Sequence, residues 1–164
     1  MLQIRSMQDD DWPEIWAVLE PTFRRGDTYA FRQDITQNEA HHYWVELPAA
    51  TYVAQDGGPV LGTYYIKPNQ PGAGSHVCNC GYVVAEVARG QGIASAMCQH
   101  SQEQARALGF RAMQYNLVVA SNTGAVWLWR RHGFEIVGTL PGAFKHPQLG
   151  YVDAHVMYKH LIDS

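Results

Sequence analysis

The chain has 164 residues, of which 46% are hydrophobic and 16% charged, and its formal net charge is −3 at pH 7. This length fits a single domain, residues 1–164, with enough chain to bury a core. There is no basic block and no apolar run of the ~20 residues that cross a membrane, so we expect neither a nucleic-acid partner nor a membrane span. Three cysteines give no disulfide framework and the first residues show no signal-peptide pattern, so we expect a reducing, cytoplasmic compartment.

The first half of the chain alternates short strands and helices. The spacing of Trp12, Ile15 and Leu19 predicts a helix that begins at Asp11, and we expect Pro21 to limit or kink it. The remaining pattern predicts strands over 2–6, 51–55 and 60–67, a helix over about 38–47, and a hairpin turn at Asp56-Gly57-Gly58.

The second half has longer elements, two of which end at glycines. A helix over 91–108 ends at Gly109 and a helix over 121–132 ends at Gly133, because glycine accepts the left-handed conformation that closes many helices. Pro and Gly cluster over 67–75 and 140–150, so both segments are predicted to be loops. Strands are predicted over 76–84, 111–119, 134–139 and 151–158, and this interleaving indicates an α/β layered domain.

The turn between the strand over 76–84 and the next helix carries two glycines, within Arg89-Gly90-Gln91-Gly92-Ile93-Ala94. Glycine permits a positive φ and lets a ligand approach the main chain closely. The first helical turn adds unpaired N–H groups and the positive end of the helix dipole, which favour a phosphate or pyrophosphate. Neither a Walker P-loop nor a Rossmann fingerprint is present. From these residues alone, the alternative that the glycines only shape a tight turn stays open.

Two segments resemble the GCN5-related N-acetyltransferases, the GNAT family. The loop from Arg89 to Ala94 is similar to the family's acetyl-CoA motif, Q/R-x-x-G-x-G/A. Downstream, the family's N-x-x-A-x-x-L-[Y]-x-x-x-G-F segment is matched at Asn122, Ala125, Leu128 and Gly133-Phe134. The resemblance implies a mixed central sheet of about seven strands flanked by about four helices and splayed between the fourth and fifth strands. It also implies acetyl-CoA as co-substrate, no metal, a small-molecule amine as acceptor, direct transfer in a ternary complex, and a homodimer.

The resemblance also assigns the coenzyme site residue by residue. The main chain of Tyr82 and Val84 would pair with pantetheine, and the backbone amides of Gln91 to Ala94 would hold the pyrophosphate. Asn122 would contact the coenzyme near its sulfur, although from the sequence it also suits a helix N-cap. The expected coenzyme-binding set is therefore Tyr82, Val84, Arg89, Gly90, Gln91, Gly92, Ile93, Ala94 and Asn122, with Asn122 also catalytic.

Asn79 and Asn116 stand inside predicted strands, where asparagine is unfavourable. From the residues, they are either strand polar groups with satisfied hydrogen bonds or ligands for a small polar substrate. The segments around Asn79, Asn116-Leu117 and Asn122 resemble a yeast-type branch of the family that acetylates L-azetidine-2-carboxylate and cis-4-hydroxyproline. That resemblance implies that Asn79, Asn116 and Leu117 bind the acceptor, and that acetylation detoxifies a proline analogue.

Trp129 stands where many relatives carry a tyrosine that protonates the leaving thiolate. An indole has no usable acidic proton. The thiolate must therefore be protonated by water or by the amine's own proton, and Asn122 would stabilise the sulfur. We expect Trp127 and Trp129 to be packing residues. Three cysteines are expected to be small buried side chains, neither nucleophiles nor zinc ligands: Cys78, Cys80 and Cys98.

No motif singles out a general base. The candidates by location are Glu86, Asp153, His146 and His155. The alternatives are a water chain or binding of the small neutral fraction of the amine.

The resemblance also implies that the segment from Arg24 to Thr36 borders the acceptor site. The side chains of Tyr29, Phe31 and Arg32 are therefore expected to line the wall of that site. Two alternative functions stay open: acetylation of another amine (an antibiotic, a polyamine or a protein amino group), and a non-catalytic acyl-CoA-binding sensor.

Overall fold

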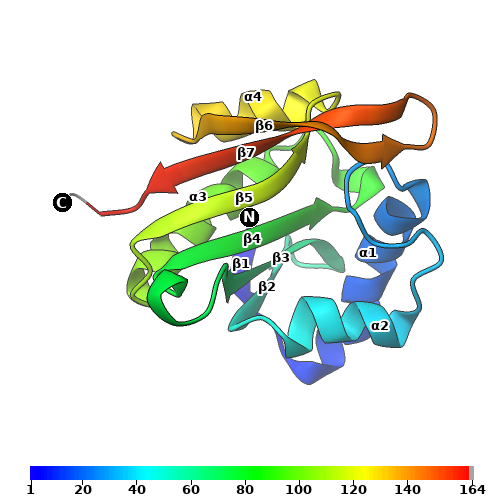
Figure 1. Cartoon of the computed structure of the whole chain (residues 1–164). Helices are drawn as coiled ribbons and strands as arrows, with labels where there is room; N and C mark the ends of the chain where they lie inside the picture. Colours follow the sequence, from blue (N-terminus) through cyan, green and yellow to red (C-terminus); the bar gives the residue numbers. More distant parts are fainter. Residues whose placement is uncertain (163–164) are drawn as a thin grey trace.

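The computed structural model describes residues 1–162, which form a seven-stranded sheet in the order β1-β2-β3-β4-β5-β7-β6 (Figure 1). The strands are β1 (Gln3–Ser6), β2 (Ala50–Gln55), β3 (Val60–Pro68), β4 (Val77–Val84), β5 (Ala112–Val119), β6 (Glu135–His146) and β7 (Gly150–His160). Four α-helices connect them: α1 (Trp12–Arg25), α2 (Gln37–His41), α3 (Ile93–Ala107) and α4 (Thr123–Arg131). Neighbouring strands pair antiparallel except β4 and β5, which are parallel. The predicted mixed sheet is confirmed.

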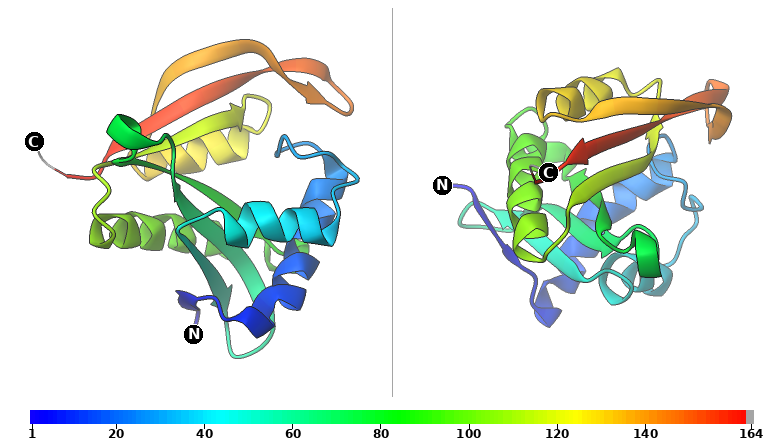
Figure 2. Two further views of the ribbon diagram at one scale, coloured as in Figure 1. Left: turned by 60° about the horizontal axis from the view of Figure 1, so that its bottom comes forward. Right: turned by 60° about the vertical axis from the view of Figure 1, so that its left-hand side comes forward.

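Helices cover both faces of the sheet, with α1 and α2 on one face and α3 and α4 on the other (Figure 2). Side chains alternate across a strand, so each face has its own core. On one face Tyr64 packs with Met97 of α3, and on the other Tyr65 packs with Trp44 and Phe23 of the α1 side. No helix within residues 1–162 combines the length and the apolar character needed to cross a membrane.

Helix α1 continues past Pro21 to Arg25 and ends at Gly26, which has a φ of 68°. The prediction that Pro21 limits this helix was therefore wrong. Proline removes one backbone hydrogen bond, but Pro21 is exposed while Leu19 and Phe23 are buried in the core. Burial of that apolar face holds the helix together across the proline.

The segment over 140–150, predicted as a loop, is instead the outer part of the β6–β7 hairpin. Leu140 pairs with Ala154 and Phe144 with Val152, and the register shifts between Leu140 and Phe144. This irregularity accommodates Pro141, because β6 is an edge strand and one side of its main chain needs no partner. Phe144 is only 5% exposed, and its burial is the packing reason that extends the strand.

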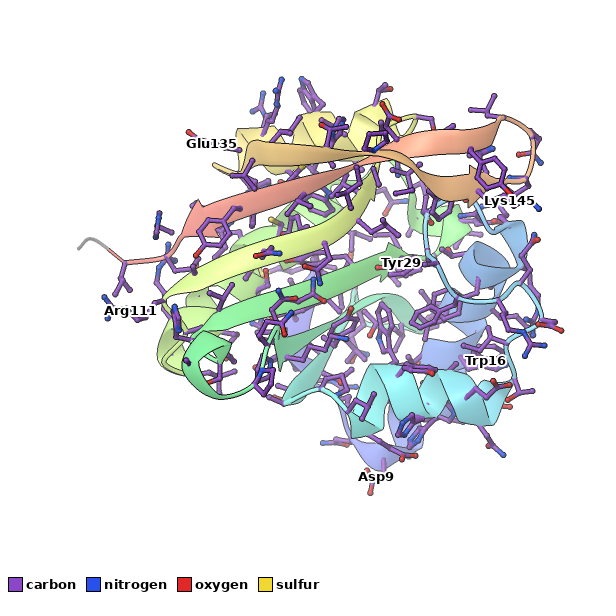
Figure 3. The ribbon with its side chains drawn as sticks, in the orientation of Figure 1. Asp9, Trp16, Tyr29, Arg111, Glu135 and Lys145 are labelled. Atoms are coloured by element: carbon purple, nitrogen blue, oxygen red, sulfur yellow. The ribbon has the colours of Figure 1, made fainter. Side chains whose placement is uncertain are left out.

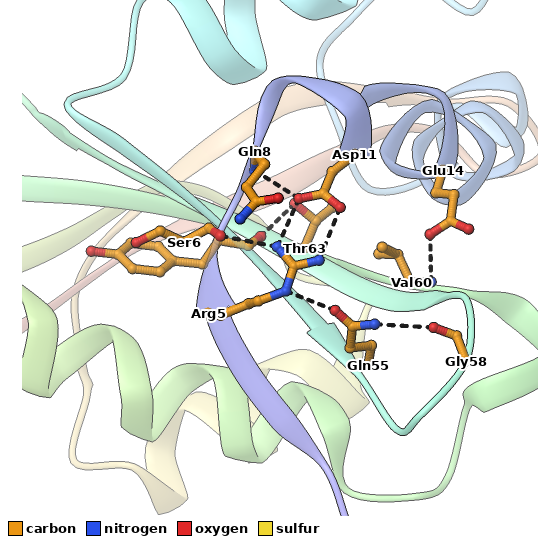
Figure 4. A network of polar contacts seen from close by, with 10 residues as sticks. Arg5, Ser6, Gln8, Asp11, Glu14, Gln55, Gly58, Val60 and Thr63 are labelled. Carbon is orange, nitrogen blue, oxygen red and sulfur yellow. Dashed lines mark hydrogen bonds and ion pairs between the residues drawn. The ribbon is translucent and has the colours of Figure 1, made fainter.

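An ion pair ties β1 to the start of α1 (Figure 4). The Arg5 guanidinium donates to both carboxylate oxygens of Asp11 over 2.8 and 2.9 Å, and to Gln55 Oε1 over 2.8 Å. The Gln8 N–H also donates to Asp11, over 2.7 Å. The hydrogen bond from Arg5, followed by that from Gln8, holds the pKa of the Asp11 carboxyl below its usual value against the opposing effect of burial.

Candidate active site

Strands β4 and β5 pair at Val77↔Ala112 and Cys78↔Met113 and then diverge. At the fork, the side chain of Asn79 takes the place of main-chain pairing. Its Nδ2 donates to the Gln114 carbonyl over 2.9 Å, and its Oδ1 accepts from the Tyr65 hydroxyl over 3.1 Å. Beyond Asn79 the splay opens into a cleft of about 700 Å³, and both strands line it.

The edge of β4 that faces the cleft has main-chain groups that pair with no strand beyond Cys78. Hydrogen-bonded residues alternate along an antiparallel pair. Ala85 donates to the Leu61 carbonyl, and Val77 accepts from Asn69, so the odd-numbered residues of β4 bond to β3. The even-numbered Tyr82 and Val84 therefore turn their main-chain groups toward β5, which has already splayed away. These are the two residues expected to pair with pantetheine.

The glycine loop lies between β4 and α3. Gly90 and Gly92 have φ values of 77° and 80°, a region that only glycine enters at low cost. A side chain on either would meet nothing within 4 Å, so the backbone conformation, and not crowding, requires glycine. Gly92 is the N-cap, and α3 consequently begins at Ile93 and not at the predicted 91. The N–H groups of Ile93 to Ser95 precede the first intrahelical donor, Ala96, and fit an anionic group.

Asn122 and Trp129 lie on the helix that borders β5. The Asn122 Oδ1 accepts from the Ala125 N–H over 3.2 Å, so this residue is the N-cap of α4 and also lines the cleft. Trp129 packs against Tyr82 and Tyr115, with ring centroids 5.0 Å apart in each case. The structure thus gives Trp129 the packing role predicted for it. Trp127 is 58% exposed, and the prediction that it packs was wrong because it lies on the outer face of α4 beneath Arg131.

The hydroxyl groups nearest Trp129 belong to a buried network. The hydroxyls of Tyr82 and Tyr115 lie 2.9 Å apart, and Tyr82 also bonds Ser101 over 2.6 Å. Burial raises the pKa of both phenols well above the ordinary value. Neither hydroxyl is therefore suited to replace the acid that Trp129 lacks.

The segment between α1 and α2 forms the opposite wall of the cleft. The Tyr29 hydroxyl donates to the Tyr82 carbonyl over 2.9 Å, so Tyr29 reaches across the end of β4 (Figure 3). The ring of Phe31 stacks on Tyr29 at 6.0 Å, and both line the cleft as expected. Arg32 does not line it, because its guanidinium is exposed and pairs with Asp34 over 2.9 Å.

Asn116 and Leu117 line the cleft from β5. The amide of Asn116 is exposed and already bonded on both sides. It accepts from Gln114 Nε2 over 2.9 Å and donates to Asn69 Oδ1 over 2.7 Å. All three predicted acceptor residues line the cleft, with Asn79 buried on β4 where the strands part and Asn116 exposed on β5.

None of the four side chains considered as a general base lines the cleft. Glu86 pairs with Arg25 at its rim, and Asp153 accepts from the Gly142 N–H over 3.0 Å. His155 bonds Thr139 over 2.9 Å, and His146 accepts from the main chain of its own turn. Among residues 1–162, the lining of the cleft includes no Asp, Glu or His.

The cysteines are free and buried, as expected. Burial raises the pKa of the Cys80 and Cys98 thiols, which makes both poor nucleophiles. The described part of the chain, 1–162, holds no cluster of three or more His, Cys, Asp or Glu side chains that could bind a metal.

The lining also includes residues that were not predicted, among them Tyr65, Lys67 and Tyr115. Tyr65 and Lys67 are on β3, whose relation to the cleft depends on its register with β4. No local motif marks these positions, so the sequence alone offers no signal for them.

A mixed sheet splayed between its only described parallel pair, with a glycine loop and helix N-terminus beside the splay, defines a coenzyme-dependent acyl transferase. Residues 2–134 match the acetyltransferase (GNAT) family. The chain belongs to that family and is an acetyl-CoA-dependent N-acetyltransferase.

Known proteins agree with this assignment. The chain is 32% identical over 152 residues to N-acetyltransferase aca1 of Schizosaccharomyces pombe, covering 82% of this chain and 73% of the relative. Its structure is similar to that of a GCN5-related N-acetyltransferase from Kribbella flavida, with a TM-score of 0.92, 43% identity and 97% of each chain covered. A phosphinothricin acetyltransferase from Sinorhizobium meliloti, solved with acetyl-CoA, has a TM-score of 0.86 at 20% identity, covers 97% of this chain and 88% of that one, and shares the fold.

Proposed function

We propose that this enzyme transfers the acetyl group of acetyl-CoA to the nitrogen of a small amino or imino acid. Our preferred acceptors are the proline analogues azetidine-2-carboxylate and cis-4-hydroxyproline, whose acetylation would detoxify them. One observation carries the proposal. On its coenzyme side the cleft has a strand edge that pairs with no other strand and the two ends of the glycine loop, Arg89 and Ala94. On its acceptor side it has amides and aromatic rings.

The coenzyme side fits acetyl-CoA by its backbone. Gly90 and Gly92 leave open space in front of the loop. The N–H groups from Gln91 to Ala94 would hold the pyrophosphate, and Arg89 at the exposed rim would add a positive charge. The main chain of Tyr82 and Val84 would extend the edge of β4 toward the pantetheine. When bound, acetyl-CoA supplies an activated thioester whose acetyl group passes to an amine.

The acceptor side would act by positioning. The acceptor would be held by Asn79, Asn116 and Leu117 so that its nitrogen faces the thioester. Such alignment can lower the activation barrier by ~7–11 kcal/mol. Asn122 would stabilise the departing sulfur with its amide N–H, since its Oδ1 is committed to Ala125. Because the lining within 1–162 has no carboxylate or imidazole, the amine would bind in its neutral form or lose its proton to solvent.

We also propose that the chain works as one acetyltransferase domain, in the cytoplasm and as a homodimer. The three free buried cysteines support a reducing compartment. The dimer rests on the family resemblance.

A thiol-release assay with acetyl-CoA tests the function. The panel would hold azetidine-2-carboxylate, cis-4-hydroxyproline, proline and unrelated amines, including a polyamine, an aminoglycoside and a peptide amine. Turnover restricted to the cyclic imino acids supports the proposal. Turnover only on other amines would support acetyl transfer and contradict the proposed acceptor. Tight binding of acetyl-CoA without turnover on any amine favours a coenzyme sensor.

A further inference from the structure

We propose that Lys67 binds a carboxylate of the acceptor, so that the enzyme selects amines that carry a carboxylate beside the reacting nitrogen. The inference rests on the proposed function and deepens it. It names a specificity-determining residue on β3, outside both sequence motifs, and excludes cationic acceptors such as polyamines.

The register of the sheet places Lys67 in the acceptor half of the cleft. Lys67 lies directly opposite Asn79 in the β3–β4 pair, and residues opposite each other in a pair project to the same face. Its Nζ lies 5.3 Å from the centre of the Tyr65 ring, the residue whose hydroxyl bonds Asn79. The ammonium group thus stands beside the fork at which β4 and β5 separate.

Lys67 is a cation without an anionic partner. Of the three cationic side chains that line the cleft, Arg25 pairs with Glu86, and Arg89 is exposed on the coenzyme loop. Lys67 is half-buried and makes neither an ion pair nor a hydrogen bond through its side chain to any residue of the described chain, 1–162. Burial lowers the pKa of Lys67, and no carboxylate of the described chain offsets that effect.

The surroundings of Lys67 are neutral hydrogen-bonding groups. A chain of bonds runs from the Tyr65 hydroxyl to Asn79, from Asn79 to the Gln114 carbonyl, and from Gln114 through Asn116 to Asn69. Such groups orient a ligand without neutralising the cation. An anionic ligand group would gain a charge-assisted hydrogen bond from Lys67. A second ammonium group would meet a like charge with no carboxylate in the lining to offset it.

The test compares acceptors with and without the carboxylate, at equal concentrations of the neutral amine. Coenzyme A release would be measured with L-proline, L-prolinamide and pyrrolidine, and with azetidine-2-carboxylate and its amide. For the wild-type enzyme we expect a kcat/KM for the acid roughly 10- to 100-fold above that for the amide, since a bond to a charged group is worth about that factor. K67Q should remove this preference by raising KM for the acid far more than KM for the amide. K67R should restore part of it.

The matched control is K145Q, because Lys145 is an exposed lysine on β6 whose ammonium lies over Tyr151, outside the cleft. It should leave every acceptor unaffected. Equal turnover of acid and amide by the wild-type enzyme would overturn the inference. So would a K67Q variant that lowers turnover of acid and amide alike, because that pattern indicates a structural role.

A binding measurement separates failure of this inference from failure of the proposed function. The chain has three lysines, so 13C-methylated lysine side chains give few NMR signals, and K67R identifies the signal of Lys67. With coenzyme A present, titration with proline or azetidine-2-carboxylate should shift the Lys67 signal, and prolinamide should not. A shift of the Lys67 signal without turnover would support the carboxylate-binding site and contradict the proposed reaction. No shift with any of these acids overturns the site.

Discussion

The side-chain amide of Asn79 donates to the main-chain carbonyl of Gln114 over 2.9 Å, at the point where β4 and β5 stop pairing. One asparagine side chain therefore closes the fork of the splayed sheet and also lines the cleft. The interpretation of Asn79 as a strand polar group with satisfied hydrogen bonds is confirmed, and its role as a substrate ligand stays a prediction. Its Oδ1 and Nδ2 each hold one protein partner, and one amide hydrogen stays available.

Replacement of Asn79 by alanine should affect both stability and binding. Asn79→Ala leaves the buried Tyr65 hydroxyl and the Gln114 carbonyl without their partner, so we expect a loss of about 1–3 kcal/mol in the free energy of unfolding. It should also raise KM for the acceptor. Asn116→Ala removes an exposed amide and should raise the same KM with little change in stability. Urea unfolding and steady-state kinetics measure the two effects. Full stability of Asn79→Ala would contradict the role given to it at the fork.

The coenzyme loop depends on the backbone conformation of Gly92. Gly92→Ala should cost about 1–2 kcal/mol, because an L-residue at a φ of 80° is strained, and should raise KM for acetyl-CoA as the loop shifts. Gly109→Ala is the matched control. It has a φ of 92° at the other end of α3, also with open space around it, and should lose similar stability without any change in KM. Equal KM changes in both variants would show that the loop has no special part in coenzyme binding.

Trp129 should be replaceable by another aromatic residue. Since it packs between Tyr82 and Tyr115 and donates no proton, Trp129→Phe should lower kcat by far less than the ~10²-fold that loss of a general acid costs. The shape of the pH–rate profile should also stay the same. Trp127→Phe is the control, because it replaces an indole on the exposed face of the same helix, α4. A loss of 10²-fold or more confined to Trp129→Phe would mean that the indole takes part in the chemistry.

Acid should weaken the clamp between Arg5 and Asp11. Because the pKa of Asp11 is lowered in the folded state, its contribution is complete above the unfolded value of about 3.9 and is lost as pH falls through the folded value. Asp11→Asn should therefore destabilise the protein near neutral pH by about 1–3 kcal/mol and flatten the loss of stability below about pH 4. Thermal unfolding across pH measures both.

The exposed pair of Arg32 and Asp34 is the control for that experiment. Asp34→Asn should change stability little at any pH, because solvent screens exposed ion pairs. If Asp11→Asn behaved in the same way as Asp34→Asn, the clamp would contribute nothing to the fold.

Some local patterns were sufficient to predict the local structure. Gly90 and Gly92 indicated the turn before α3, because only glycine enters the left-handed region cheaply. Gly109 and Gly133 indicated where α3 and α4 end. Local patterns were insufficient at Pro21 and over 140–150, where burial of Phe23 and Phe144 outweighs the local preference of proline and glycine for breaks.

By itself, then, the sequence determined the order of the elements, the glycine loop and the membership of an acetyltransferase family, because these depend on residues close together in the chain. Only the tertiary structure decided which side chains line the cleft together. Lys67 faces Asn79 because β3 and β4 pair in one register, and a shift of one residue would turn both side chains to the other face. The fold likewise keeps the four candidate general bases out of the lining: Glu86 pairs with Arg25 at the rim, and three others bond groups elsewhere, namely Asp153, His146 and His155.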